Sequence, residues 1–270
     1  MVSAELAPWL PVAWTTLVLL IVAAFGAGWI DAVVGGGGLI QLPALVIGLP
    51  QTLPSPYVLG TNKLASFMGT LSASLVYLRK LRTQLVVILP LVIGAYAGST
   101  GGAWLSRFLP REVLTPIVLV AVVGIGAYML FKPSLGLSHE PRHEGSSLGW
   151  RSGLIGVSVG FYDGLLGPGT GSFFVILMVA VLGFGFLEAS VNAKIANVVT
   201  NIAAITLYGL QGEVVWVLGL CMGAANVLGA VIGARMAVRR GSSFVRKIFV
   251  VAISILALKL GWDTLDLFLL

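Results

Sequence analysis

Four ionisable residues, Asp31, Lys63, Asp163 and Lys194, lie within long apolar stretches of this 270-residue chain. Asp163 follows Asp31 by 132 residues, and Lys194 follows Lys63 by 131. An ion inside a membrane-spanning segment costs at least about 2.5–3.5 kcal/mol and normally faces the bundle interior or a cavity. Two acids and two cations at equivalent positions therefore predict a shared site in which the lysines supply positive charge to an anion.

A structural interpretation of the same residues stays open. Each lysine can extend from a helix start to the membrane interface, with only its charged end in water. Each aspartate can pair with a lysine or cap a helix. In that case the four residues hold the fold and bind no ligand.

Glycines surround both aspartates. A glycine, an aromatic residue, the acid, and glycines four and six residues beyond the acid occur in the same order in Gly28–Ile40 and in Gly160–Gly171. Nucleotide-binding loops are glycine-rich too, but the Lys-Ser/Thr pair or ribose-binding acid that follows them is missing here. Each glycine stretch instead precedes an apolar helix, whose free N–H groups and positive dipole end suit an anion.

The lysines share helix faces with other polar residues. Ser66 and Thr70 follow Lys63 by three and seven positions, and Asn197 and Asn201 follow Lys194 at the same spacing. Residues so spaced lie on one face of a helix. Together with the glycine loops they predict a substrate-binding set comprising Asn62, Lys63, Ser66, Lys194, Asn197, Asn201, Gly36, Gly37, Gly169 and Thr170. Asp31 and Asp163 are expected to hold the broken segments or to carry a coupling proton, because a charged carboxylate repels an anion.

Composition identifies the environment of these residues. Hydrophobic residues make up 58% of the chain and charged residues 10%, and the mean hydropathy is +1.03. A soluble domain needs a more charged surface. The apolar runs lack the alternation of barrel strands, so the sequence predicts an all-α, multi-pass protein in the lipid bilayer, with roughly eight to ten segments.

The second half of the chain repeats the first. We expect a first transmembrane repeat in residues 1–131, a solvated cytoplasmic linker in 132–150 and a second repeat in 151–270, each repeat with about five segments. Residues 39–49 and 172–187 are too short to cross easily, which predicts broken helices or re-entrant pieces near the midplane. Gly94, Gly98 and Gly102 are spaced for close helix contact. Proline residues 50, 54 and 56 predict a stiff connection that ends at 60–63.

Loop charges indicate that the two repeats are inverted. Arg79, Lys80 and Arg82 follow the first lysine-bearing helix, whereas Gln211-Gly212-Glu213 follows the second and contains no cation. The next loop reverses this difference. Since cytoplasmic loops carry the Lys/Arg excess, equivalent loops are expected on opposite sides of the membrane. Arg107 and Arg111 are exceptions, because both would then lie outside.

Other functional classes find less support in the residues. The net charge of +6 comes from scattered cations, which argues against a nucleic-acid partner. His139 and His143 lie in the linker, so the membrane segments lack a histidine for an intramembrane hydrolase or a metal site. The single Cys221 excludes an internal disulfide, and we find no cofactor motif. A channel-like or structural membrane protein remains an alternative to a transporter, and an intramembrane enzyme a weaker one.

The motifs resemble the TauE/SafE sulfite exporter family. The resemblance rests on residues 31–40 with Pro43 following, on 60–63, and on the second-half motifs 163–164 and 193–197, and it spans nearly the whole chain. It implies a permease of the cytoplasmic (inner) membrane that moves sulfite, sulfonates or related sulfur-containing anions. We expect alternating access around one central anion site, driven by a gradient. The many small-residue faces would permit a homodimer.

Overall fold

The computed structural model describes residues 12–50, 52–105, 136–165 and 167–269, and within them all regular structure is helical. The expected segment Leu114–Phe131, with Arg107 and Arg111, lies outside the described residues. The elements in chain order are α1 (Trp14–Val34), α2 (Gly38–Gly48), α3 (Ser55–Leu78), α4 (Leu85–Leu105), α6 (Gly145–Leu165), α7 (Thr170–Leu177), the π-helix η2 (Met178–Leu182), α8 (Phe186–Leu210) and α9 (Trp216–Leu269).

Four of these helices are long and apolar enough to cross a membrane: α1, α4, α8 and the part of α9 from Trp216 to Ala252. Many large apolar side chains on the outside of the bundle are exposed, among them Leu19 and Leu85. Such a surface suits lipid tails and does not suit water. These features support a multi-pass membrane protein, as the composition predicts.

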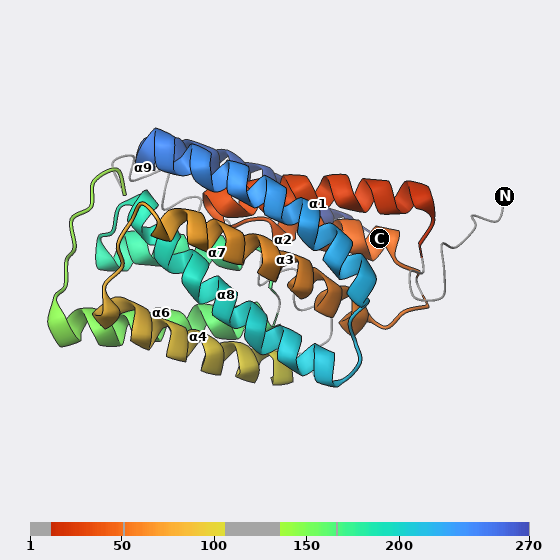
Figure 1. Cartoon of the computed structure of the whole chain (residues 1–270), viewed down its shortest axis with the longest axis horizontal. Helices are drawn as coiled ribbons and strands as arrows, with labels where there is room; N and C mark the ends of the chain where they lie inside the picture. Colours follow the sequence, from red (N-terminus) through yellow and green to blue (C-terminus); the bar gives the residue numbers. More distant parts are fainter. Residues whose placement is uncertain (1–11, 51, 106–135, 166, 270) are drawn as a thin grey trace.

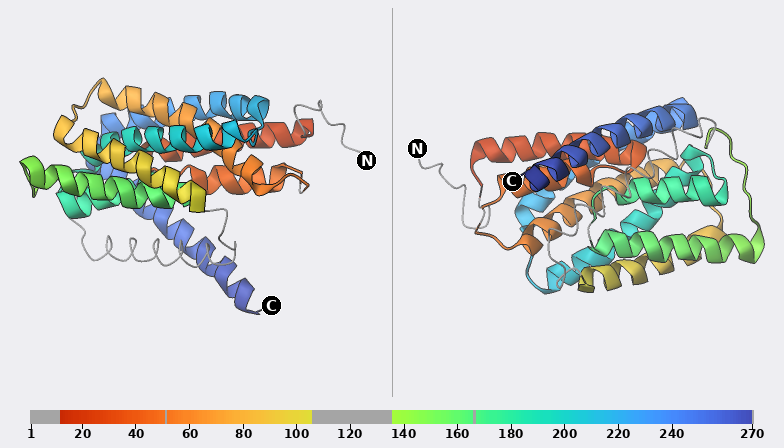
Figure 2. Two further views of the ribbon diagram at one scale, coloured as in Figure 1. Left: turned by 90° about the horizontal axis from the view of Figure 1, so that it is seen from below. Right: turned by 180° about the vertical axis from the view of Figure 1, so that it is seen from behind.

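The long helices lie roughly along one axis in three groups (Figure 1). Helices α1 and α9 pack against each other on one side, α4 and α6 pack on the opposite side, and α3 and α8 lie between them. Helix α9 bends at Gly241, whose φ of 73° and ψ of −173° interrupt the helix. Figure 2 shows the part of α9 beyond this bend running obliquely to the rest.

Small residues allow the closest helix contacts. Gly94, Gly98 and Gly102 of α4 lie against the backbone of α6, where Gly98 faces Val157 and Phe161. Gly229 of α9 is packed in the same way against the backbone of α1. A side chain at any of these glycines would separate the two helices. The predicted close contact along α4 is thus confirmed.

Helix α3 begins earlier than expected, at Ser55, and so includes residues 60–63, which the prolines led us to place in a connection. Pro54 is the N-cap and Pro56 lies in the first turn of the helix. Proline is tolerated there because the first N–H groups of a helix have no intrahelical acceptor. The prolines therefore begin the helix, and Asn62 and Lys63 are fixed on its surface.

The described part of the linker is largely exposed from 136 to 144, as expected of a solvated loop, but it also contacts the helix bundle. Residues 145–150 form the first turns of α6. Before them, the chain lies against the turn between η2 and α8, where the N–H of Glu140 donates to the carbonyl of Gly183 over 3.0 Å. The Arg142 guanidinium donates to the carbonyl of Ala180 over 2.7 Å. The sequence could not show these contacts, because they use backbone groups of a distant turn.

Candidate anion site

Two helix interruptions build the centre of the molecule. Helix α1 ends at Gly35, which has a φ of 83° and donates its N–H to the carbonyl of Asp31 over 2.8 Å. After α6, Gly167 and Gly169 have φ values of 84° and 78°. Glycine adopts this left-handed conformation without steric cost. The chain can therefore end one helix and start the next within a few residues.

The two glycine loops contact each other directly. The backbone of Gly35 lies so close to that of Gly171 that neither position has room for a Cβ atom. The N–H of Ser172 donates to the carbonyl of Gly35 over 3.2 Å, and its hydroxyl donates to the carbonyl of Val34 over 2.7 Å. The N-terminal ends of α2 and α7 consequently meet near the middle of the molecule, and the two short helices extend to opposite sides (Figure 1).

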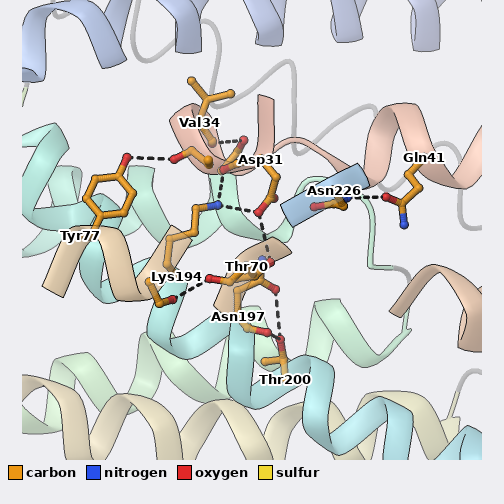
Figure 3. A network of polar contacts seen from close by, with 12 residues as sticks. Asp31, Val34, Gln41, Thr70, Tyr77, Lys194, Asn197, Thr200 and Asn226 are labelled. Carbon is orange, nitrogen blue, oxygen red and sulfur yellow. Dashed lines mark hydrogen bonds and ion pairs between the residues drawn. The ribbon is translucent and has the colours of Figure 1, made fainter. Parts of the chain in front are cut away.

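Each lysine forms an ion pair with an aspartate of the other half. The Nζ atom of Lys63 lies 2.7 Å from Oδ2 of Asp163. The Nζ atom of Lys194 lies 2.9 Å from Oδ2 of Asp31, as Figure 3 shows, and also contacts the carbonyl of Asp31. Both lysines are buried. The structure therefore favours pairing over extension of the lysines to the membrane interface, and the two cations and two acids sum to no net charge.

Hydroxyl groups complete the environment of the carboxylates, but unequally. Thr170 donates to Oδ1 of Asp163 over 2.6 Å, so both oxygens of Asp163 have a donor. Thr70 donates to the same Oδ2 of Asp31 that Lys194 binds. Among the described residues no donor lies on Oδ1 of Asp31, and this side chain is 14% exposed against 1% for Asp163.

A pocket opens between the loops and the lysine-bearing helices, with about 300 Å³ of empty space, part of it open to solvent. Its lining includes nine of the twelve residues that the sequence analysis assigned to the site. They are Asp31, Asn62, Lys63, Ser66, Asp163, Gly169, Thr170, Asn197 and Asn201. The pocket is therefore almost wholly lined by polar side chains and glycine backbone.

Three assigned residues do not line this pocket. Lys194 is absent from the lining, and its hydrogen bonds to the described residues are with Asp31. Gly37 packs against Ala27 and the side chain of Asp31, and Gly36 packs against Ile30. Four glycines that the sequence did not predict also line the pocket: Gly35, Gly38, Gly167 and Gly171.

The Nδ2 group of Asn201 is buried and has no hydrogen-bond partner among the described residues. Asn201 is 2% exposed and lines the pocket. A buried amide donor without an acceptor is unfavourable by about 1–3 kcal/mol. A ligand that offers an acceptor oxygen in the pocket would satisfy this donor.

Two buried polar residues next to the pocket were missed by the sequence analysis. Gln41 of α2 contacts Asn62, and Asn226 of α9 contacts Gln41. Each had a recognisable signal, because Gln41 is the only polar side chain in α2 and Asn226 lies in a long apolar run. Polar residues in such runs often indicate function. Neither falls in a duplicated motif, so the comparison of the two halves did not select them.

Comparison with known proteins identifies the family. The sulfite exporter TauE/SafE family matches residues 20–260. Two relatives named as probable membrane transporter proteins are each 37% identical. One, from a Sinorhizobium species, matches 93% of this chain and 94% of its own length, and the other, from Haemophilus influenzae, matches 92% and 95%. The probable membrane transporter protein YfcA of Escherichia coli K12 is 34% identical over 91% of this chain and 90% of its own length.

No solved structure matches the chain significantly. The family match covers most of the chain, including both glycine loops and both lysines. The relatives are named as probable membrane transporters, in agreement with long apolar helices around a buried polar pocket. The chain is thus a membrane transporter and belongs to the sulfite exporter TauE/SafE family.

Proposed function

We propose that this protein is a secondary transporter that carries sulfite or a related sulfonate through the pocket between the two glycine loops. The observation that carries this proposal is the buried Nδ2 donor of Asn201, which has no partner among the described residues, in a polar pocket where two helices begin. Both helices direct their positive dipole ends to this point, although several of their first N–H groups, such as those of Leu39 and Ser172, already donate to carbonyls of the glycine loops. The family name supplies the substrate class.

The lysines act in this proposal by exchanging partners. In the present state their charge is satisfied by the aspartates, so the pocket offers an anion mainly neutral donors. When the anion enters, Lys63 turns from Asp163 to the substrate and forms a charge-assisted hydrogen bond, which is stronger than a neutral one. Because Lys63 and Asp163 belong to different halves of the chain, this exchange loosens a contact between the halves. Substrate binding is thereby coupled to movement.

Alternating access follows from an inverted arrangement of two repeats. Supporting this arrangement, each helix of the first half runs opposite to its counterpart in the second half: α1 opposite to α6, α3 opposite to α8, and α4 opposite to α9 (Figure 1). The close contacts repeat as well: Gly98 faces Val157 and Phe161, and Gly229 faces Phe25 and Trp29, residues 132 positions earlier in each case. Rocking of one half against the other would open the pocket to each side in turn.

The positions of the loops support one orientation of the protein in the membrane. One end of the long axis holds the segment 79–84, the described linker segment 136–144 and the bend of α9 (Figures 1 and 2). The other end holds the loop 211–213 (Figure 1). The first end carries basic residues, among them Arg79, Lys80 and Arg82, which supports a cytoplasmic location for it by the positive-inside rule. We propose the cytoplasmic membrane as the location. A homodimer stays a prediction, since the small-residue faces on α4 and α9 are used within the chain.

Asp31 is proposed to carry the coupling proton, and Asp163 to hold the second loop. The two differ because Oδ1 of Asp31 has no donor among the described residues, whereas each oxygen of Asp163 has one, from Lys63 or Thr170. An anion close to a charged Asp31 is repelled. A proton on Asp31 removes this repulsion, so that anion and proton enter together.

The proposal is tested by counterflow in proteoliposomes. Vesicles loaded with unlabelled sulfite should accumulate radiolabelled sulfite transiently when they contain the parent protein, and Asn201→Leu should abolish this accumulation. Ser152→Ala serves as the control, because Ser152 is a buried polar residue of α6 that bonds only its own helix over 2.8 Å. Counterflow that is absent for sulfite and for methanesulfonate in the parent would reject the proposed substrate class.

A further inference from the structure

A chain of three side-chain amides connects the outer helix α9 with the pocket. Asn226 donates from Nδ2 to Oε1 of Gln41 over 2.6 Å, a contact drawn in Figure 3. Gln41 donates from Nε2 to Oδ1 of Asn62 over 3.0 Å and lies 3.1 Å from the Asn62 carbonyl oxygen. Gln41 and Asn226 are buried, at 0% and 3% exposure. Three amides in series make a continuous buried path that ends at a pocket residue.

The backbone carbonyl of Asn62 determines which end of each amide in this path, the oxygen or the NH₂ group, faces its neighbour. The carbonyl oxygen of Asn62 can only accept a hydrogen bond, so the Gln41 atom that faces it must be the NH₂ group. The same NH₂ group faces the side chain of Asn62, which must present its oxygen there. The other end of Gln41 is then an oxygen, and Asn226 must donate to it. The NH₂ group of Asn62 is consequently turned away from Gln41 and is available to the pocket that Asn62 lines.

Glycines on two further helices make room for the first member of the path. The Oδ1 atom of Asn226 lies against Gly69 of α3 and Gly28 of α1, where an added Cβ atom would collide with it. The amide of Asn226 is therefore held on several sides.

The second half of the chain has no equivalent path. The positions that correspond to Gln41 and Asn226, at the offsets of 132 and 131 residues, are Phe173 and Ala95. On that side of the pocket the free donor is the Nδ2 group of Asn201, which has no partner among the described residues. The ammonium of Lys63 is taken by Asp163. In this state the described residues offer a ligand mainly neutral donors, and the buried path fixes the donor of Asn62.

We propose that Gln41 and Asn226 are positioning residues that hold Asn62 as a hydrogen-bond donor, so that the pocket selects an anionic oxygen that carries no proton. This inference rests on the proposed anion transport and adds a criterion for the substrate. An ionised sulfonate presents only acceptor oxygens and meets the criterion. A protonated oxygen that points its hydroxyl hydrogen at Asn62 meets the NH₂ group of Asn62, which is also a donor. Neither the hydroxyl hydrogen nor the amide hydrogen then has an acceptor, which is unfavourable.

A double-mutant cycle on the full-length protein in detergent tests this role. Dissociation constants are measured for methanesulfonate and for sulfite in the parent, Asn62→Ala, Gln41→Met, Asn226→Ala and the double variants with Asn62→Ala. Loss of a hydrogen bond to a charged ligand weakens binding about tenfold or more, so Asn62→Ala should do so. Gln41→Met and Asn226→Ala should each weaken binding several-fold to tenfold. Each double variant should bind within about twofold of Asn62→Ala alone, because the path acts through Asn62.

Different results would refute the positioning role and the proposed anion transport. Ser152→Ala, a buried polar substitution outside the pocket, should bind like the parent. A double variant whose loss is the product of the two single losses overturns the positioning role, as does parent-like binding by both Gln41→Met and Asn226→Ala. Asn226→Ala also decides the question if Gln41→Met fails to fold, since it is the far end of the path. A parent that binds neither anion instead refutes the proposed function, and the inference with it.

Discussion

The charged residues of the site form two ion pairs, each between a lysine of one half of the chain and an aspartate of the other half. Lys63 of the pocket pairs with Asp163, and Lys194 beside it pairs with Asp31, so each lysine is neutralised by an aspartate. The sequence could predict that these four residues meet, because an intramembrane ion needs a polar environment. It could not predict the partner of each lysine, because both aspartates have the same chemistry. The partner depends on how the glycine loops pack against each other.

Removing one member of an ion pair should destabilise the protein. Lys63→Ala leaves the carboxylate of Asp163 buried without its cation, and such changes typically destabilise by about 3–5 kcal/mol. Replacing both residues, in Lys63→Met with Asp163→Leu, should recover most of the stability because no buried charge remains. Thermal unfolding in detergent measures both effects. A Lys63→Ala protein as stable as the parent would show that the pair does not hold the halves together.

Replacing each aspartate by its amide should separate the two proposed roles. Asp31→Asn should retain sulfite counterflow but lose accumulation driven by a pH gradient, because the amide cannot carry the proton. Asp163→Asn should keep the response to the gradient, with lower stability from the weakened contact to Lys63. Both are compared at equal amounts of folded protein in the vesicles. Gradient-driven accumulation by Asp31→Asn would assign the proton to another group.

Among the elements, the short helices α2 and α7 with their glycine loops determine where the site lies. Their shortness was evident in the sequence, and the short helix α2 confirms that residues 39–49 do not form a full span. The direct contact between Gly35 and Gly171 was not predictable, because a glycine repeat does not specify which backbone it approaches. Likewise, the prolines before Asn62 read as a connection but begin α3, since their effect depends on position within the first turn.

A methyl group at this crossing should separate the loops. Gly35→Ala adds a Cβ atom where the backbone of Gly171 lies and requires a left-handed conformation at a φ of 83°, so we expect strong destabilisation and loss of counterflow. Gly26→Ala is the matched control, because no atom lies within 4 Å of its added Cβ. Alanine in the helix should even stabilise, by up to about 1 kcal/mol. Equal thermal stability of the two variants would contradict the backbone crossing.

For the whole molecule, the account depends on two halves that face opposite sides of the membrane. The sequence indicated this arrangement through loop charges, and the opposed directions of corresponding helices support it (Figure 1). Repeated motifs in a sequence reveal that the two halves are duplicated, but not how each half is oriented in the membrane. The residue spacing along a helix is the same in either direction. The exchanged ion pairs and the α1–α9 and α4–α6 contacts between halves arise only in three dimensions.

Cysteine accessibility tests the orientation directly. In a Cys221→Ser background, a cysteine introduced at Gln211 should react with a membrane-impermeant maleimide added to intact cells, and one introduced at Lys80 should react only after the cells are opened. Both positions are exposed and lie in turns that follow equivalent helices, α8 and α3. Equal labelling of the two positions in intact cells would reject the inverted arrangement.

The position of a bound anion shows whether the pocket between the glycine loops is the substrate site. Selenite has the charge and shape of sulfite, and its selenium atom can be located by anomalous X-ray scattering in crystals soaked with it. The account predicts one selenium peak in the pocket, with oxygens in hydrogen-bonding distance of the side-chain amides of Asn62 and Asn201. A protein that transports selenite but binds it away from these residues would contradict the account.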